Sequence, residues 1–230
     1  MRFYARCILL WMLIYGISAA RRKKARGPSN LLHSLMRDYS KLFRPNNGAN
    51  ATEITLGLDI KDVVSLKEGT LQSRITFVAW LKLNWTDARL MWDPDHFSIR
   101  DVRLDSSKIW TPDIKLVNSL DPTPNRDWGV RVLISFDGTI RGVMPIQLPV
   151  HCGRPRDPHA SWECKISFRS WTYTVDDLNL VLERNVSDIG TYNDRVWLIT
   201  GNEARRTVIR NDGSPERYAL LTYVIKLIRH

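Results

Sequence analysis

Residues 75–85 read Ile-Thr-Phe-Val-Ala-Trp-Leu-Lys-Leu-Asn-Trp, with an apolar side chain at every second position. A period of two predicts a β-strand that buries one face in a core. The opposite face carries Lys82 and Asn84, but also Trp80. A large aromatic side chain outside the core face either packs beneath a loop or lines an interface or a pocket, and both interpretations stay open for Trp80.

The same alternation recurs along the rest of the chain. Residues 54–60, 130–136 and 164–168 alternate in this way, and a last strand is expected from 218 to 228. Many short strands separated by turns predict an all-β fold, an immunoglobulin-like β-sandwich of about ten strands. Trp171 continues the polar face of the strand that begins at 164, so it is a second tryptophan outside the predicted core.

One helix is expected before the strands. Its apolar positions form a single stripe of an amphipathic helix over residues 28–44, namely Leu31, Leu32, Leu35, Met36, Tyr39, Leu42 and Phe43. Ser29 or Asn30 can cap its start, and the turn residues at 45–48 end it.

The first twenty residues are typical of an export signal. Arg2 and Arg6 precede an apolar run over residues 7–17, and the small residues 18–20 suit a signal peptidase. The run is shorter than the roughly 20 residues that a membrane span needs, and no amphipathic face marks it as a buried helix. We therefore expect a signal peptide at 1–20, a basic flexible arm at 21–27, one folded domain at 28–230, and a secreted, extracellular protein.

The net charge of +10 is concentrated near the N-terminus. Five of the positive side chains lie in the run 21–26, which indicates a disordered arm or a processing site, with a membrane- or polyanion-binding arm as the alternative. The rest of the chain is only mildly basic, so the charge gives no argument for nucleic-acid binding. No second apolar stretch is long enough to predict a membrane span.

Two cysteines remain once Cys7 leaves with the signal. In an oxidising compartment Cys152 and Cys164 are expected to form a disulfide, worth about 3 kcal/mol in the chain-entropy model. A metal site is the alternative, but His151 and His159 beside the pair fit no zinc spacing. We expect no metal and no cofactor.

Three Asn-x-Ser/Thr triplets are present. Asn50 and Asn185 lie in polar, turn-like stretches and are predicted glycosylation sites, whereas Asn84 lies within a strand pattern and is a poorer candidate. No nucleophile-and-base arrangement occurs among the histidines, serines and carboxylates, and the Asp176-Asp177 pair is better explained as the start of a loop or as a weak cation site. We therefore predict that the chain is not an enzyme.

Four stretches, taken in order, resemble one known family. They are Trp-Leu-Lys-Leu-Asn-Trp-Thr-Asp at 80–87, Leu-Met-Trp-Asp-Pro at 90–94, Lys-Ile-Trp-Thr-Pro-Asp-Ile at 108–114 and Ser-Trp-Thr-Tyr at 170–173. With them, residues 28–230 resemble the extracellular ligand-binding domain of Cys-loop receptors, nearest to the nicotinic branch and the soluble acetylcholine-binding proteins. The resemblance implies a homopentameric ring in which aromatic side chains of two neighbours surround a small cationic ligand.

The resemblance also implies which residues meet the ligand. Trp171 and Tyr218 match the principal face, and Trp80 matches the tryptophan supplied by the complementary face. Variable complementary positions are matched by Leu133, Arg141 and Val143, and structural positions by Trp92, Trp110, Pro112 and Asp113.

Two positions depart from the family pattern. Val117 replaces a tyrosine, and an ungapped alignment puts Arg210 where the capping loop has its first tyrosine. The adjacent cysteine pair of that loop is absent, and residues 211–215 form a strong turn signal instead. Arg210 either pairs with Asp212 or Glu216 at the surface, or points inward and disfavours a quaternary ammonium.

The segment between the two cysteines, residues 153–163, is polar and charged where channel-forming relatives have an apolar core. This polar composition is typical of a loop that faces water. We therefore predict a secreted, soluble, pentameric protein that binds a small cationic or amphipathic ligand. The alternatives are a pentamer that does not bind acetylcholine, with another ligand or a structural role, and the extracellular part of a ligand-gated channel subunit.

Overall fold

The computed structural model of the chain describes residues 27–46, 50–67, 72–120, 129–153, 161–190, 192, 196–211 and 213–229. Its elements are α2 (Pro28–Met36), β1 (Thr52–Lys67), β2 (Gln72–Met91), α3 (Pro94–Phe97), β3 (Asp101–Asp105), the 3-10 helix η1 (Ser106–Lys108), β4 (Ile114–Leu116), β5 (Arg131–Ser135), β6 (Asp137–Gly153), β7 (Trp162–Ser170), β8 (Leu178–Leu182), β9 (Trp197–Arg210) and β10 (Arg217–Arg229). The predicted signal peptide, the arm at 21–26, and loop residues 154–160 lie outside the described residues.

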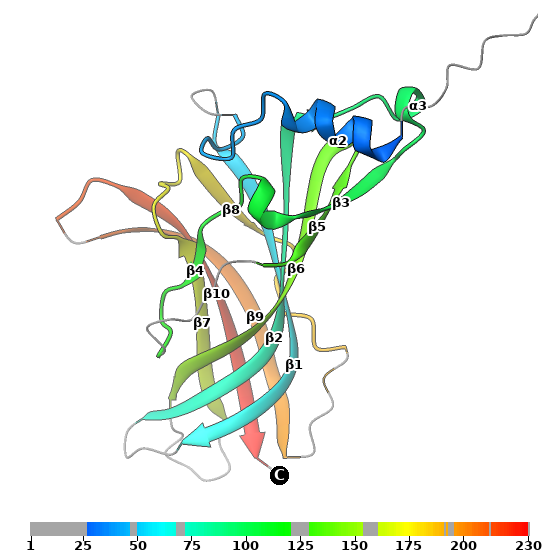
Figure 1. The fold of residues 1–230 in the computed structure, drawn as a ribbon. Helices are drawn as coiled ribbons and strands as arrows, with labels where there is room; N and C mark the ends of the chain where they lie inside the picture. The colour runs from blue at the N-terminus through cyan, green and yellow to red at the C-terminus, as the bar shows by residue number, and fades with distance from the viewer. Residues whose placement is uncertain are drawn as a thin grey trace, which may run out of the picture.

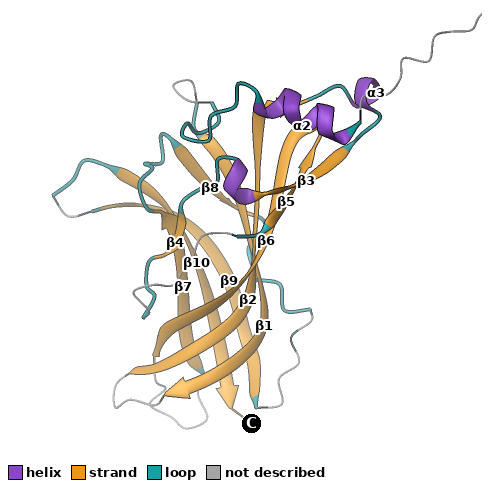
Figure 2. Cartoon of the chain, in the orientation of Figure 1, coloured by secondary structure: helices purple, strands orange, loops and turns teal. Residues whose placement is uncertain are grey.

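Ten strands among the described residues form one continuous hydrogen-bonded sheet that folds over into a sandwich (Figure 1). The main path runs β8-β1-β2-β6-β7-β10-β9, with β5 between β3 and β6, and β4 beside β7. The β1–β8 pair is parallel, and the other described pairs are antiparallel. Figure 2 shows the helices gathered at the end of the sandwich opposite to the end of β10. The predicted all-β sandwich with one preceding helix is confirmed.

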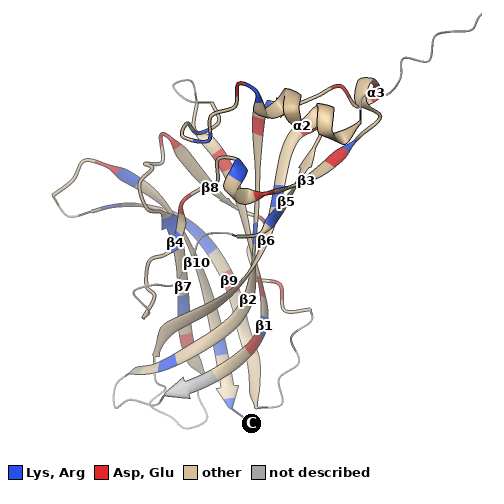
Figure 3. Ribbon diagram, in the orientation of Figure 1, with Lys and Arg blue, Asp and Glu red and all other residues tan. Residues whose placement is uncertain are grey.

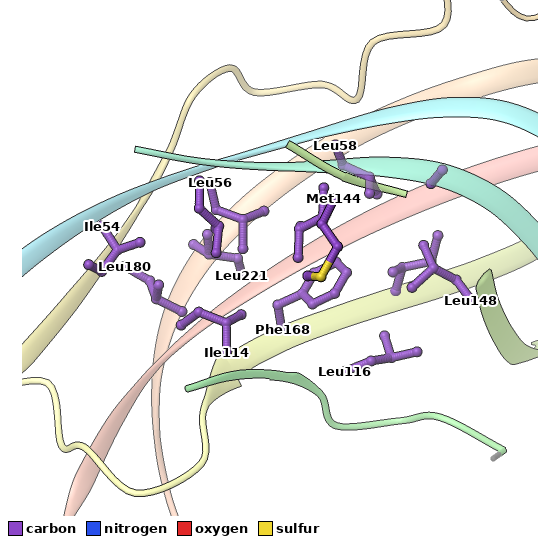
Figure 4. Close-up of a cluster of buried hydrophobic side chains, with 14 of the residues drawn as sticks. Ile54, Leu56, Leu58, Ile114, Leu116, Met144, Leu148, Phe168, Leu180 and Leu221 are labelled. Atoms are coloured by element: carbon purple, nitrogen blue, oxygen red, sulfur yellow. The ribbon is translucent and has the colours of Figure 1, made fainter. Parts of the chain in front are cut away.

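The core follows from the period-two pattern. Side chains from both layers meet between the sheets (Figure 4). They include Ile54, Leu56 and Leu58 of β1, Ile114 and Leu116 of β4, Met144 and Leu148 of β6, Phe168 of β7, Leu180 of β8 and Leu221 of β10, each at most 8% exposed. Every predicted core position from Ile75 to Trp85 is at most 3% exposed. Trp80 and Trp171, predicted to lie outside the core, are 46% and 62% exposed.

The helix is shorter than predicted, because tertiary contacts draw the chain out of it. It ends at Met36 and not at residue 44. The Tyr39 hydroxyl donates to the Asp87 carboxylate at 2.9 Å, and the buried Arg44 guanidinium lies 2.9 Å from the Asp177 carboxylate. The chain reaches these partners because it forms turns, and not further helix, after Met36. A satisfied buried polar group outweighs a further turn of helix, since leaving it unpaired costs about 1–3 kcal/mol.

Two further expectations about this segment are wrong. Leu42 and Phe43 do not continue a buried stripe, and are 80% and 55% exposed. The helix begins after Gly27 with Pro28 in its first turn and without a side-chain cap from Ser29 or Asn30. Proline suits this position because its missing N–H is one that the first turn leaves unpaired anyway.

Cys152 and Cys164 form the predicted disulfide, with their Cα atoms 4.3 Å apart. The bond joins β6 to β7 and both residues are fully buried, so it lies where the two layers meet. Asn50 and Asn185 are exposed. Their glycosylation stays a prediction.

Candidate functional site

Trp171 follows β7 directly, and hydrogen bonds hold its backbone on both sides. Its N–H donates to the Asp113 carbonyl at 3.2 Å. The Asp113 carboxylate accepts from the Ser170 hydroxyl at 2.5 Å and from the N–H and hydroxyl of Thr172, each at 2.7 Å. The indole remains exposed. The local sequence Ser-Trp-Thr, together with Asp113, therefore presents this ring to solvent from a fixed support.

Tyr218 lies at the start of β10. Continued three residues beyond its last pair, Leu221 with Phe168, the β7–β10 register brings Tyr218 level with Trp171. Its hydroxyl donates to the Glu216 carboxylate at 2.6 Å, and this hydrogen bond raises the pKa of the Tyr218 phenol. The Arg169 guanidinium carbon lies 4.7 Å from the centroid of the ring. Tyr218 is only 6% exposed. One face of its ring is therefore covered by a cation of its own chain.

Val117 follows β4 on the same outward face. The β4–β7 register pairs Lys115 with Arg169, and the Val117 N–H donates to the Ser167 carbonyl at 2.8 Å. Because alternate residues of a strand share a face, Val117 lies on the side of Arg169 and is 37% exposed. The structure thus brings Trp171, Tyr218 and Val117 together on the outer face of β4, β7 and β10. We call these three residues the principal cluster.

Arg210 belongs to the other face of the hairpin. In the β9–β10 register Arg210 is opposite Arg217, and Ile209 is opposite Tyr218. Directly opposed residues of an antiparallel pair point to the same side, so the half-buried Ile209 is the residue that shares the Tyr218 face. Asp212 lies outside the described residues, and a role for Arg210 in ligand binding stays a prediction. The sequence could have shown this. If residues are paired outward from the turn between β9 and β10, Arg210 falls opposite Arg217 and Ile209 opposite Tyr218, whereas an ungapped alignment selects Arg210.

The predicted complementary-face residues form a second group on β2, β5 and β6. The β2–β6 register places Lys82 opposite Val143 and Asn84 opposite Arg141, and β5 places Leu133 opposite Arg141. Trp80 lies two residues before Lys82 and so shares this face. We call Trp80, Leu133, Arg141 and Val143 the complementary cluster. Arg141, Val143 and Trp80 are exposed.

The Trp80 ring also carries a cation from its own chain. Lys61 is the extra residue of a β-bulge between Ile60 and Asp62, and a bulge redirects side chains locally. The Lys61 ammonium lies 4.2 Å from the centroid of the Trp80 ring. This contact could not be foreseen, since no sequence pattern marks the bulge.

Asp59 anchors the surroundings of Trp80. Its carboxylate lies 2.7 Å from the Lys82 ammonium and 3.6 Å from that of Lys61, and the residue is 5% exposed. The close Asp59 carboxylate raises the pKa of Lys82. One carboxylate therefore holds two lysines beside the exposed indole.

A chain of aromatic rings supports the Trp171 loop from beneath. Trp110 is 6.3 Å from the Trp85 ring on one side and 6.3 Å from the Tyr173 ring on the other. The Tyr39 hydroxyl accepts the Trp110 N–H at 3.0 Å. Burial raises the pKa of Tyr39, so its phenol stays protonated and can donate to Asp87. These residues position the site and do not line it.

The predicted residues thus form two clusters on different strands and not a single pocket. A separate open cavity near η1 is lined by Lys41, Leu42, Ser106, Ser107, Ile109, Trp110, Thr111 and Gly129, and none of the predicted ligand residues belongs to it. Over the described ranges, the structure shows no group of three or more His, Cys, Asp or Glu side chains that could hold a metal ion.

The helix, the sandwich, its disulfide and the two outward clusters define a ligand-binding domain of the Cys-loop receptor type. A family model described as the neurotransmitter-gated ion-channel ligand binding domain matches residues 28–230. The chain therefore belongs to this family, whose members bind ligands and are not enzymes.

Individual relatives agree with this assignment. The chain is 27% identical over 229 residues to the neuronal acetylcholine receptor subunit alpha-9 of Gallus gallus, which covers 96% of this chain and 47% of that subunit. It is 31% identical over 183 residues to the acetylcholine receptor subunit gamma of Gallus gallus, which covers 76% of this chain and 34% of that subunit. The chain spans about half the length, or less, of the curated relatives it matches.

A solved structure superposes on most of this chain. Capitella teleta AChBP in complex with lobeline superposes with a TM-score of 0.79 at 26% identity, covering 88% of this chain and 97% of that one. Where the structure describes the present chain, it contains no helix with the length and apolar character to cross a membrane.

Proposed function

We propose that this chain is an extracellular, pentameric ligand-binding protein that holds a small amphipathic molecule between neighbouring subunits. The observation that carries the proposal is the division of the retained residues into two outward clusters. The principal cluster and the complementary cluster lie on different strands of one chain, so neither encloses a ligand alone. Two copies placed side by side would bring Trp171 and Tyr218 of one against Trp80 of the other.

The exposed rings support an apolar contact with the ligand. Trp171 is 62% and Trp80 is 46% exposed, and each is a large apolar side chain on the outer face of its cluster, where such exposure marks an interaction site. Aromatic side chains contribute a large apolar surface at low entropic cost, and therefore dominate interfaces and small-molecule sites. Between the cationic and the amphipathic ligand expected from sequence, the covered rings of Tyr218 and Trp80 favour the amphipathic one.

The test is a mass measurement combined with a titration. We expect the secreted chain to elute at five times the protomer mass by light scattering, and its tryptophan fluorescence to change saturably with an aromatic amphipathic ligand. Trp171→Phe should abolish most of the change, whereas Trp162→Phe, which alters an indole on β7 outside both clusters, should not. A monomeric mass with no change up to millimolar ligand would refute the proposal.

A second candidate is the extracellular part of a channel subunit. It is favoured by one observation, that the match to the curated receptor subunits covers 34% to 47% of their length. A transcript that continues in frame beyond His230 into apolar segments would establish it. A transcript with a stop codon after His230 would argue against it.

A further inference from the structure

Two retained rings of the proposed site carry positive charges of the chain itself. The Lys61 ammonium lies 4.2 Å from the centroid of Trp80, and the Arg169 guanidinium carbon lies 4.7 Å from that of Tyr218. Both distances are within the roughly 6 Å over which a cation is attracted by a ring face. These ring faces, one in each cluster, therefore already hold a cation.

Neighbouring contacts hold both cations in place. Arg169 also donates to the Asn211 side-chain oxygen at 3.2 Å, which ties it to the start of the β9–β10 turn. Lys61 is the extra residue of the β-bulge, and its ammonium lies 3.6 Å from the Asp59 carboxylate. Figure 3 shows that lysine and arginine recur along β7 and β9, the strands on either side of β10.

The carboxylates near the rings already accept hydrogen bonds or ion pairs from groups of this chain. Asp59 makes its shorter contact with Lys82, at 2.7 Å, and Glu183 and Asp188 also act on that lysine. Glu216 accepts the Tyr218 hydroxyl, and Asp113 accepts three hydrogen bonds around Trp171. The charged groups that lie against the rings are thus basic, while the acidic ones serve as hydrogen-bond acceptors beside them.

We propose that Lys61 and Arg169 are specificity-determining residues, which exclude ammonium ligands from this site and bind the anionic group of an amphipathic ligand. A ligand ammonium at either ring would displace a tethered cation or approach it closely, and like charges repel more strongly once a partner subunit excludes water. A ligand carboxylate would instead pair with Lys61 or Arg169, leaving Trp171 to contact the apolar body. This inference rests on the proposed function, and names the ligand class of the same site.

The experiment uses three probes that share a phenylpropyl skeleton and carry an anionic, a neutral or a cationic head group: 3-phenylpropionate, 3-phenylpropionamide and 3-phenylpropylammonium. Each is titrated into the secreted wild-type oligomer and followed by calorimetry and tryptophan fluorescence. We expect the carboxylate to bind at least about tenfold more tightly than the ammonium, the size of one charge–ring or charge–charge contact in a desolvated site. The neutral amide should fall between them.

Charge-removing variants locate the preference. Lys61→Met with Arg169→Gln should weaken carboxylate binding and strengthen ammonium binding, so that the order of the two probes reverses. Lys226→Met on the far part of β10 and Arg37→Gln beside α2 remove the same charges away from both rings, and should leave the order unchanged. Each single variant should give part of the shift, which keeps the test informative if the double variant folds poorly.

The outcomes separate the two proposals. A pentamer that binds the ammonium as tightly as the carboxylate, or whose preference survives Lys61→Met and Arg169→Gln, refutes the inference and leaves the proposed function standing. A monomer, or a pentamer that binds none of the three probes at millimolar concentration, refutes the proposed ligand site and the inference with it.

Discussion

At the scale of the residue, the place across from Tyr218 belongs to Ile209. A ring at this position would face Tyr218 and the proposed ligand, whereas a change at Arg210 would act on the other side of the hairpin. We expect Ile209→Tyr to tighten binding of 3-phenylpropionate about fivefold, the value of one added aromatic contact. Arg210→Ala should change it less than about twofold. Calorimetric titration of both variants decides, and a larger effect at Arg210 would contradict the register.

A second residue-level prediction concerns alkaline pH. Tyr223 is fully buried and donates to the Leu56 carbonyl at 3.1 Å, and burial raises the pKa of its phenol above the ordinary 10.0. The folded state therefore holds this proton after the unfolded state has lost it. The stabilisation is complete below about pH 10 and is lost as the pH rises toward the folded-state pKa, by up to about 1.4 kcal/mol per pH unit.

Urea unfolding of wild type and Tyr223→Phe between pH 8 and 11 measures this. At pH 8 the variant should be less stable by about 0.5–1.5 kcal/mol, because the Leu56 carbonyl loses the Tyr223 hydrogen bond and keeps only that from the Glu183 N–H. Above pH 10 the gap should narrow, since the variant has no phenol to ionise. Parallel curves over the whole range would show that Tyr223 does not carry the effect.

At the scale of the element, a single side chain bridges the two ends of the main strand path. The Arg206 guanidinium on β9 donates to the Leu180 carbonyl at 2.8 Å and to the Asn179 side chain at 2.7 Å, both on β8. We expect Arg206→Ala to lower the free energy of unfolding by about 1–3 kcal/mol, the value of hydrogen bonds from a charged donor. Arg205→Ala alters the next residue, which faces the other way, and should change it by less than about 0.5 kcal/mol. Equal losses in the two variants would argue against the bridge.

Elements differed in how far their sequence could predict them. Strands with one buried face were predictable, because a period of two admits only one side for the core, and Ile75 to Trp85 follow it throughout. The end of α2 was not predictable, because it depends on the distant partners of Tyr39 and Arg44. The contact of Lys61 with Trp80 depends on a bulge, and the Ile209–Tyr218 pairing on the length of a turn, and neither leaves a mark in hydrophobic periodicity.

At the scale of the whole molecule, the proposed ring leaves some faces open and buries others. Asn50 and Asn185 lie outside both clusters, whereas Asn84 is paired with Arg141 on the complementary face. A glycan on Asn84 would stand where a neighbour is proposed to dock. We expect mass spectrometry of the secreted protein to find glycans at Asn50 and Asn185 and an unmodified Asn84. A fully occupied Asn84 in a pentameric fraction would contradict this choice of interface.

A site shared between neighbours also makes a quantitative prediction for mixed rings. Trp171→Ala removes the principal ring and Trp80→Ala the complementary one, so a homopentamer of either variant has no complete site and should lose saturable binding. When the two variants are co-expressed in equal amounts, an interface is intact only if its principal face comes from the Trp80→Ala chain and its complementary face from the Trp171→Ala chain. Random assembly gives that combination at about a quarter of the interfaces, since each face has an even chance of coming from either variant in a closed heterologous ring.

Calorimetry of the mixed rings should therefore recover about a quarter of the wild-type stoichiometry with the wild-type affinity. A site contained within one chain would recover nothing on mixing, because every subunit would still lack one of the two tryptophans.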